Sequence, residues 1–268
     1  MDRHPLVAGQ FYPAGPSLAK DVAAFLGLAG SPREEPTILA MVPHAGYVYS
    51  GAVAGKTLGL ARLADTVILL GPNHTGRGRR LAVWPDGRWD VPGGGLSVDE
   101  ELARALLAAD TRLAEDYEAH LGEHSLEVIV PFLRGINPAT RIVPIVVAEY
   151  NPTVLADVAV SMAGVVKSWP GPVSIVVSSD MSHYVSHDTA KSLDALALAE
   201  IAALRPMGLF SVVRDRGITM CGVLPMTLAL FLARELGART AEVAAYATSG
   251  EVSGDMRHVV GYAGVLVS

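Results

Sequence analysis

The chain has 268 residues, of which 50% are hydrophobic and 18% charged, and its formal net charge is −6. Such a chain can bury a substantial core, and its acidic balance argues against a nucleic-acid partner, since phosphate binding needs a basic face. No run approaches the roughly 20 apolar residues that cross a bilayer, and the first residues lack the apolar core of a signal peptide. The single cysteine cannot form an internal disulfide. We therefore expect a cytoplasmic protein with no membrane partner.

The first half of the chain alternates between strand-like and helix-like periodicity. In order we expect helix 17–28, strand 37–42, helix 52–63, strand 66–71, a hairpin within 81–91, helix 98–109 and helix 123–134. Ser17 is a candidate cap for the first helix, and Ser97 with Glu100 has the spacing of a capping box. Asp86-Gly87 is typical of a tight hairpin turn.

The second half continues the same alternation. We expect strand 141–148, helix 153–167, strand 172–179, helices 188–203 and 222–236, and strands 241–248 and 258–266. Strands that alternate with helices favour an α/β fold, with a mostly parallel, mixed sheet and helices on both faces. No linker, composition break or internal repeat divides residues 1–268, so we expect a single domain.

Two histidines share one placement after apolar runs. His44 follows Val42-Pro43, and His74 follows Pro72-Asn73. Proline cannot donate to a sheet ladder, so it marks where each strand stops. The carboxyl ends of parallel strands meet at one edge of the sheet, where open α/β proteins bind ligands. One such histidine is usually an ordinary loop residue, but the repetition favours a functional pair.

A third strand is followed by Asp180 and His183, within the sequence SSDMSHY. A carboxylate and an imidazole this close can pair, which would fix the tautomer of the ring and raise its basicity. The same residues could instead form a loop that caps the helix starting near residue 188. The segment alone leaves both interpretations open.

The only cysteine, Cys221, precedes Gly222 and an apolar helix with Pro225 in its first turns. A thiol at a helix amino terminus has a lowered pKa, so its thiolate is accessible as a metal ligand or a nucleophile. Free cysteine is also often buried and inert. Imidazoles, a carboxylate and a thiolate that met at one sheet edge would suit a transition metal.

Glu123 and His124 begin the predicted helix 123–134. Acidic residues at a helix start are favoured by the helix dipole whatever the function. His124 could still face the pocket as a partner of the ligands. The segment 51–57 looks like a phosphate loop, but it is one residue too short and suits the apolar helix better.

Six segments carry motifs along essentially the whole chain. They are VAGQFYP at 7–13, PHAGYVYSG at 43–51, GPNH at 71–74, EHSLE at 123–127, SSDMSHY at 178–184 and CGVLP at 221–225. Taken together and in this order, they resemble the Memo family, whose prokaryotic members are called AmmeMemoRadiSam system protein B. The resemblance implies a fold similar to that of class III extradiol dioxygenases, which are non-heme Fe(II) enzymes.

The resemblance also implies roles for individual residues. Those dioxygenases hold iron with two histidines and a glutamate. Here His44 and His74 would be the histidine ligands, and Cys221 would take the place of the glutamate. His183 falls at the motif that supplies the acid–base histidine, with Asp180 beside it. The thiolate is softer than a carboxylate and shifts the preference toward copper(I), zinc or a thiolate-ligated iron.

The leading hypothesis is a non-heme metal protein with an open site that faces a small-molecule pocket. Fe(II) is the first candidate for its cofactor, and copper or zinc are the alternatives. The expected chemistry is redox or oxygenase chemistry, in which His183 moves protons while Asp180 holds it. Glu123, His124 and Tyr47 are expected beside the ligands or in the pocket wall.

Two other functions remain as alternatives. The chain could be a non-catalytic protein that binds a peptide, a metabolite or a metal in a retained pocket. It could also be a cysteine hydrolase that uses Cys221 with His183 and needs no metal. Partner proteins of the same AmmeMemoRadiSam system are further candidate ligands.

Overall fold

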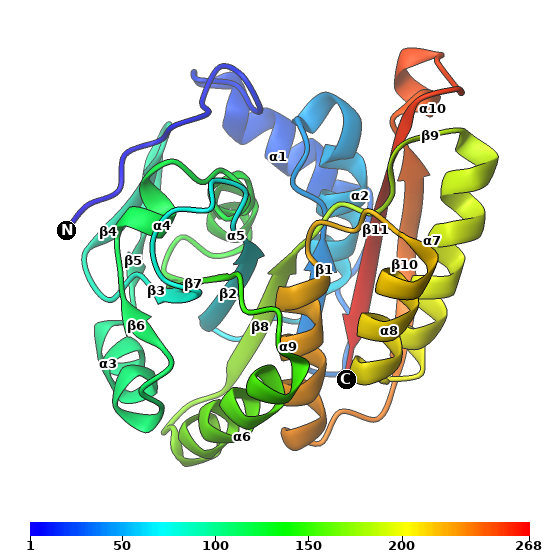
Figure 1. Ribbon diagram of the computed structural model, residues 1–268. Helices are drawn as coiled ribbons and strands as arrows, with labels where there is room; N and C mark the ends of the chain where they lie inside the picture. Colours follow the sequence, from blue (N-terminus) through cyan, green and yellow to red (C-terminus); the bar gives the residue numbers. More distant parts are fainter.

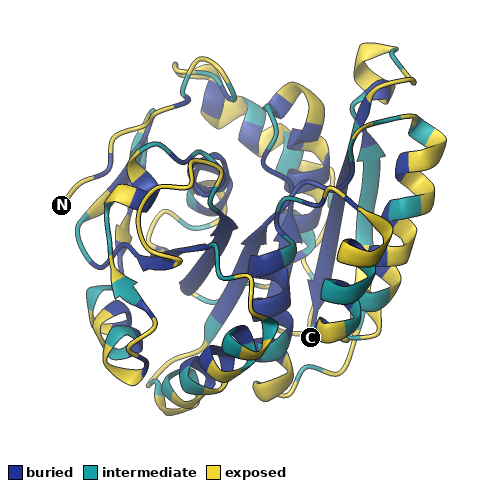
Figure 2. Cartoon of the chain, in the orientation of Figure 1, coloured by how far each residue is buried: buried dark blue, intermediate teal, exposed yellow.

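Four parallel strands form the centre of an 11-stranded sheet in the computed structural model, which describes residues 1–268 (Figure 1). They lie in the order β1 (Leu39–Val42), β8 (Val173–Ser178), β2 (Thr66–Pro72) and β7 (Arg141–Val147). Apart from the first residues of β8 and β7 they are buried throughout, as expected of parallel strands covered on both faces. Figure 2 shows this buried centre. The predicted α/β fold with a mostly parallel, mixed sheet is confirmed.

Further strands, some antiparallel and some parallel to their neighbours, extend the sheet at its edges. Beyond β1 lie β11 (Val259–Val267) and β10 (Ala241–Thr248), and β9 (His183–Val185) also pairs with β11. Beyond β7 lie β3 (Leu81–Val83), β6 (Ala114–Glu115), and the hairpin of β4 (Arg88–Val91) and β5 (Gly94–Val98). The last two strands of the chain, β10 and β11, therefore close the β1 edge of the sheet.

Helices cover both faces of the sheet, and each face has its own apolar cluster. One face carries α1 (Ser17–Gly27), α2 (Tyr47–Leu60), the 3₁₀ turn η1 (Glu127–Ile129) and α5 (Val130–Ile136). The other carries α3 (Glu100–Ala109), α6 (Pro152–Ser168), α7 (His187–Ala202), α8 (Pro206–Arg216) and α9 (Val223–Glu235). Two single turns, α4 (Glu118–Leu121) and α10 (Gly250–Ser253), lie in connections. No helix combines the length and the apolar character needed to cross a membrane.

The expected hairpin at Asp86-Gly87 is wrong. Strand β3 pairs with β7 and β6 rather than with β4, and the amide of Trp84 continues this pairing by donating to the carbonyl of Pro144. The hairpin joins β4 to β5 and turns at Pro92-Gly93. Gly93 has a φ of 84° there, which side-chain-bearing residues rarely adopt.

Two expected caps are also wrong. Ser97 lies in β5, and the carboxylate of Asp99 accepts from the amide of Leu102 and caps α3. Ser17 is already inside α1, which has no side-chain cap. The predicted helix 123–134 is a turn followed by η1 and α5, and α8 lies where no helix was predicted.

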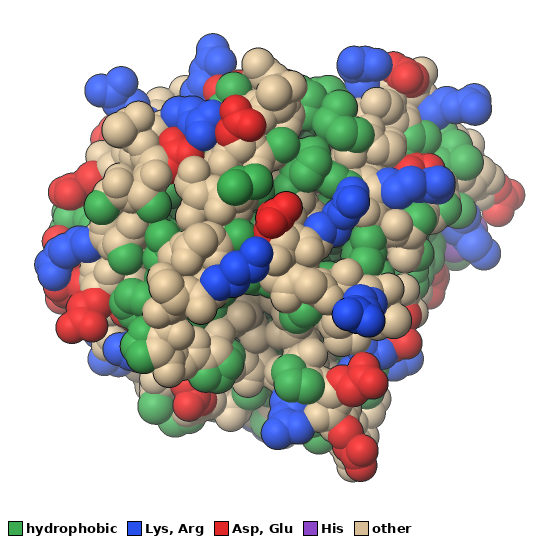
Figure 3. Space-filling view, turned by 90° about the horizontal axis from the view of Figure 1, so that it is seen from below, with side chains coloured by type: hydrophobic (Ala, Val, Ile, Leu, Met, Phe, Trp, Pro, Cys, Tyr) green, Lys and Arg blue, Asp and Glu red, His purple; other side chains and the backbone are tan.

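The face at the amino ends of the parallel strands carries lysine and arginine interspersed with aspartate and glutamate (Figure 3). The residues with metal-binding chemistry lie at the opposite ends of these strands.

Candidate metal centre

Three predicted site residues follow three neighbouring strands. His44 lies just beyond β1, Asp180 beyond β8 and His74 beyond β2, and β8 pairs with both β1 and β2. All three strands run parallel, so their carboxyl ends bring these side chains to one edge. The strand before Asp180 lies between the strands before the two histidines, although Asp180 comes long after both in sequence.

His44 is buried and held from two sides. Its amide donates to Asp180 Oδ1 at 2.8 Å, and its Nδ1 lies 2.6 Å from Ser178 Oγ. The Ser178 hydroxyl donates to the carbonyl of Ser125 at 2.6 Å, so it accepts from His44 Nδ1–H. The lone pair of the ring is then on Nε2. Burial lowers the pKa of His44 well below its usual value, which keeps the ring neutral as a ligand must be.

His74 is oriented by Glu123. Its Nδ1 lies 2.9 Å from Glu123 Oε1, and its amide donates to Glu123 Oε2 at 2.5 Å. Burial lowers the pKa of His74, but the hydrogen bond and charge of Glu123 outweigh this effect and raise the pKa overall. Burial likewise raises the pKa of Glu123, and the contact with His74 reverses this to a value of about 2. A carboxylate that accepts from Nδ1–H leaves Nε2 as the free donor atom of the ring.

Cys221 meets both the loop after β8 and His44. Its Sγ lies 3.5 Å from His44 Nε2 and accepts from the amide of Asp180 at 3.2 Å. Gly222 permits this approach, because a Cβ there would lie 2.3 Å from Ser179 Cβ. The expectation of a lowered thiol pKa is wrong: burial, and then the charge of Asp180, raise the pKa of Cys221. The desolvation of the thiolate outweighs the nearby helix terminus.

The ligand atoms of His44, His74 and Cys221 all lie within 4.8 Å of one another. The 3.5 Å separation of His44 Nε2 and Cys221 Sγ equals the edge of about 3.5 Å that tetrahedral zinc bonds of ~2.0 Å to nitrogen and ~2.3 Å to sulfur imply. Two imidazoles and a sulfur are ligands that suit iron, copper or zinc, and they do not suit magnesium or calcium. The residues present therefore fit a transition-metal ion.

A second group of candidate ligands, His74, Glu123 and His124, shares one histidine with the first. Glu123 Oε1 accepts from His74 Nδ1 and from the amides of His124 and Ser125, and Oε2 accepts from the amide of His74. Both oxygens are thus engaged in orienting the loop and the His74 ring. The ring of His124 stacks on that of His74 with centroids 4.9 Å apart. Glu123 therefore orients the ring of His74 by a hydrogen bond, and His124 packs against that ring.

His183 and Asp180 do not form the expected pair. His183 Nδ1 lies 2.9 Å from the carbonyl of Thr219, and its amide donates to Thr219 Oγ1. Asp180 instead accepts from the His44 amide, and burial raises the pKa of its carboxyl. A carbonyl can only accept, so His183 Nδ1 carries the proton and its Nε2 is free on a half-buried ring. The main chain orients His183, while Asp180 orients the loop that carries His44.

The comparisons with known proteins agree along the whole chain. The model of the Memo-like protein family matches residues 3–266. The chain belongs to the Memo family. A MEMO1 family protein of Sulfolobus acidocaldarius is 41% identical, and the alignment covers 99% of both chains. One of Ignicoccus hospitalis is 38% identical, with 98% of this chain and 97% of its own covered. The resemblance read from the sequence motifs is confirmed.

A solved structure shares the fold of this Memo-family chain at low sequence identity. It is an uncharacterized protein of Escherichia coli K12, with a TM-score of 0.56 and 13% identity. The match covers 86% of this chain and 99% of the other. At this identity the likeness supports the architecture, and the site rests on the geometry described above.

Tyr47, which was expected in the pocket wall, lies in the core of this Memo-family chain. It is 5% exposed, its ring lies 4.8 Å from that of Phe132, and its hydroxyl donates to the carbonyl of Val128 at 2.8 Å. The aromatic residue that reaches the histidines is Phe11, whose ring lies 4.7 Å from that of His124. Its motif, VAGQFYP, was recognised in the sequence, but nothing there distinguishes Phe11 as the contact.

A buried carboxylate anchors the segment that carries Phe11. Glu127 is fully buried and accepts from Arg3 Nη1 at 2.7 Å and from the hydroxyl of Tyr12 at 2.6 Å. It also accepts from the amides of Leu6 and Val7. These bonds hold residues 3–12 against the turn that supplies Glu123 and His124.

Ser178 and Thr219 fix the tautomers of His44 and His183, and neither was predicted as a site residue from the sequence. Ser178 is the last residue of a strand inside a recognised motif. It could have been suspected, because a hydroxyl at a buried strand end needs a partner. Thr219 has no comparable signal.

Proposed function

We propose that this Memo-family chain is a metalloprotein that binds one transition-metal ion through His44, His74 and Cys221. Fe(II) is the first candidate, and copper or zinc are the alternatives. The observation that carries the proposal is the convergence of Nε2 of His44, Nε2 of His74 and Sγ of Cys221, with Nδ1 of each histidine already engaged by Ser178 or Glu123. Such outer partners fix the ring tautomer and orientation that a metal ligand needs.

The chemistry we propose is redox or oxygenase chemistry on a small molecule. A bound ion would supply a Lewis acid and an electron-transfer centre. The chain would contribute His183, whose free Nε2 can take or give a proton while the carbonyl of Thr219 holds the ring. Phe11 and His124 would form one apolar wall beside the ligands.

A second candidate function is that of a non-catalytic protein that binds a metabolite, a peptide or the metal itself. The donor set favours this function, because the resemblance to class III extradiol dioxygenases implies that Cys221 would replace a glutamate ligand. A screen of catechols and related aromatics for oxygen uptake separates the two functions. Turnover supports the oxygenase, whereas stoichiometric metal with no oxygen uptake supports the binding protein.

The cysteine-hydrolase alternative is disfavoured. A nucleophilic cysteine needs an accessible thiolate, but burial raises the pKa of the Cys221 thiol. The ring nearest to Sγ is that of His44, whose pKa is lowered by burial.

The deciding experiment is the metal content of the chain, measured by plasma mass spectrometry on protein purified without oxygen, chelators or a histidine tag. We expect about one equivalent of iron, copper or zinc. Protein that is free of metal and also fails to take up any of the three would overturn the proposal.

A further inference from the structure

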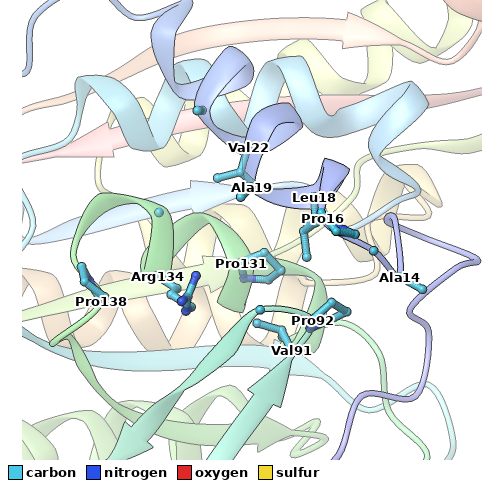
Figure 4. A pocket seen from close by; sticks show the side chains of 14 residues that line it. Ala14, Pro16, Leu18, Ala19, Val22, Val91, Pro92, Pro131, Arg134 and Pro138 are labelled. Atoms are coloured by element: carbon cyan, nitrogen blue, oxygen red, sulfur yellow. The ribbon is translucent and has the colours of Figure 1, made fainter.

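A cavity of about 730 Å³ lies between the start of α1, the turn of the β4–β5 hairpin and α5 (Figure 4). Apolar side chains form much of its wall, among them Leu18, Val22, Val91, Pro92 and Pro131. None of its lining residues belongs to the metal centre. Its volume lies in the range of roughly 300–1,000 Å³ that is typical of small-molecule pockets.

One charged side chain, Arg134 of α5, lines this cavity. It is half-buried, and its guanidinium makes no ion pair or hydrogen bond with any residue of the chain. The other arginines that are not exposed are Arg3 and Arg33, and each is paired with a carboxylate. A partly desolvated guanidinium without a partner is unfavourable, which indicates that an anion completes the site.

The hairpin holds the guanidinium of Arg134 in place. A Cβ on Gly94 would lie 2.7 Å from Arg134 Nε and 2.8 Å from its Nη2, so the guanidinium packs against the bare glycine backbone. Pro92 and Pro131 stiffen the two walls on either side. A charged group that is held before the ligand arrives loses little freedom on binding.

We propose that this cavity binds a small organic monocarboxylate with an apolar body, such as a medium-chain or aryl-substituted acid. The two parallel N–H groups of a guanidinium match the two oxygens of a carboxylate. A phosphate dianion fits less well, because Arg134 is the only charged residue in the lining. The apolar walls would take up the hydrocarbon part of the ligand.

The test is calorimetric titration of the full chain with octanoate and 3-phenylpropanoate, and with the corresponding primary amides. We expect the acids to bind at one site and the amides at least about ten-fold more weakly, as expected when a charge-assisted hydrogen-bond pair is lost. Arg134→Met should weaken the binding of the acids by a similar factor. Ala19→Phe fills the cavity without changing its charge and should abolish binding.

Arg216→Met is the matched control, because it removes an exposed and unpaired arginine on the opposite face of the sheet. Its affinity for octanoate should equal that of the parent chain. NMR shifts of the Leu18, Val22 and Val91 methyl groups should report the ligand in the cavity in both metal-free and metal-loaded protein. Equal affinity for acid and amide, unchanged binding in Arg134→Met, or no binding of either acid would overturn the proposal, whatever the metal content.

Discussion

His44 Nε2 lies 3.5 Å from Cys221 Sγ, although 177 positions separate the two residues. Asp180 links them: its carboxylate accepts from the amide of His44, and its own amide donates to the sulfur. The loop after β8 thus positions one imidazole and the thiol together. Substitutions in and around this cluster should therefore change metal binding.

Replacement of Cys221 by alanine should remove the sulfur donor. We expect metal affinity to fall by more than the roughly 10–100-fold that the loss of an outer partner costs. Plasma mass spectrometry and competition with a chelator measure the change. His183→Gln is the control and should retain its metal, because His183 is not among the ligands. Unchanged metal stoichiometry and affinity in Cys221→Ala would show that the thiol is not a ligand.

Replacement of Glu123 by glutamine should weaken metal binding without removing a ligand. The carbonyl oxygen of glutamine can still accept from Nδ1–H of His74, but the negative charge that makes the ring more basic is lost, and an NH2 group replaces the oxygen that accepts from the amide of His74. We expect metal affinity to fall roughly 10–100-fold. In metal-free protein the pKa of His74 should also fall, because the group that raises it is gone. NMR titration of the imidazole tests this, and an unchanged His74 pKa would contradict the assignment.

The same variant should change how stability depends on pH. The pKa of Glu123 is lowered from 4.5 to about 2. The contribution of the Glu123 carboxylate to the stability of the fold is therefore present above pH 4.5 and is lost as the pH falls toward 2. The pKa shift corresponds to a stabilisation on the order of 3 kcal/mol. Urea unfolding of metal-free protein measures the free energy of unfolding. The difference in this free energy between the parent chain and Glu123→Gln should become smaller from pH 6 to pH 2. A difference in the free energy of unfolding that does not depend on pH would contradict the lowered pKa of Glu123.

Arg3→Met should destabilise the fold strongly. It leaves the carboxylate of Glu127, which is 0% exposed, without its only cationic partner. Breaking a buried ion pair from one side costs about 3–5 kcal/mol. Urea unfolding measures the loss, and Arg216→Met should stay within about 0.5 kcal/mol of the parent as a surface control. A comparable loss of unfolding free energy in Arg3→Met and Arg216→Met would mean that the buried ion pair of Arg3 and Glu127 does not stabilise the fold more than a surface arginine does.

Gly222→Ala should disturb the metal centre by steric means alone. The added Cβ would lie 2.3 Å from Ser179 Cβ and 2.8 Å from the carbonyl of Ser178, so the loop that carries Cys221 must move. We expect weaker metal binding and lower stability. Gly164→Ala is the control: it lies within α6 with no atom in contact range, and it should gain up to about 1 kcal/mol from helix propensity. Normal metal affinity in Gly222→Ala would contradict the tight packing.

Local patterns in the sequence predicted much of the fold because they report burial and chain direction over a few residues. Alternating strands and helices indicated the α/β class, and the prolines after two apolar runs placed His44 and His74 at strand ends. The predictions that were wrong also relied on local patterns. Asp86-Gly87 is typical of a hairpin turn, but β3 gains more by pairing with β7 than by folding back on β4.

The sequence by itself determined the class of fold, the family, and the positions of both histidines at strand ends. Only the tertiary structure decided that β8 lies between β1 and β2, which puts Asp180 between them. It also decided that burial raises the pKa of Cys221, that Tyr47 packs inward, and that Thr219 holds His183. The reason is physical: periodicity records what each segment buries, whereas strand order, desolvation and hydrogen-bond partners depend on residues far away in the chain.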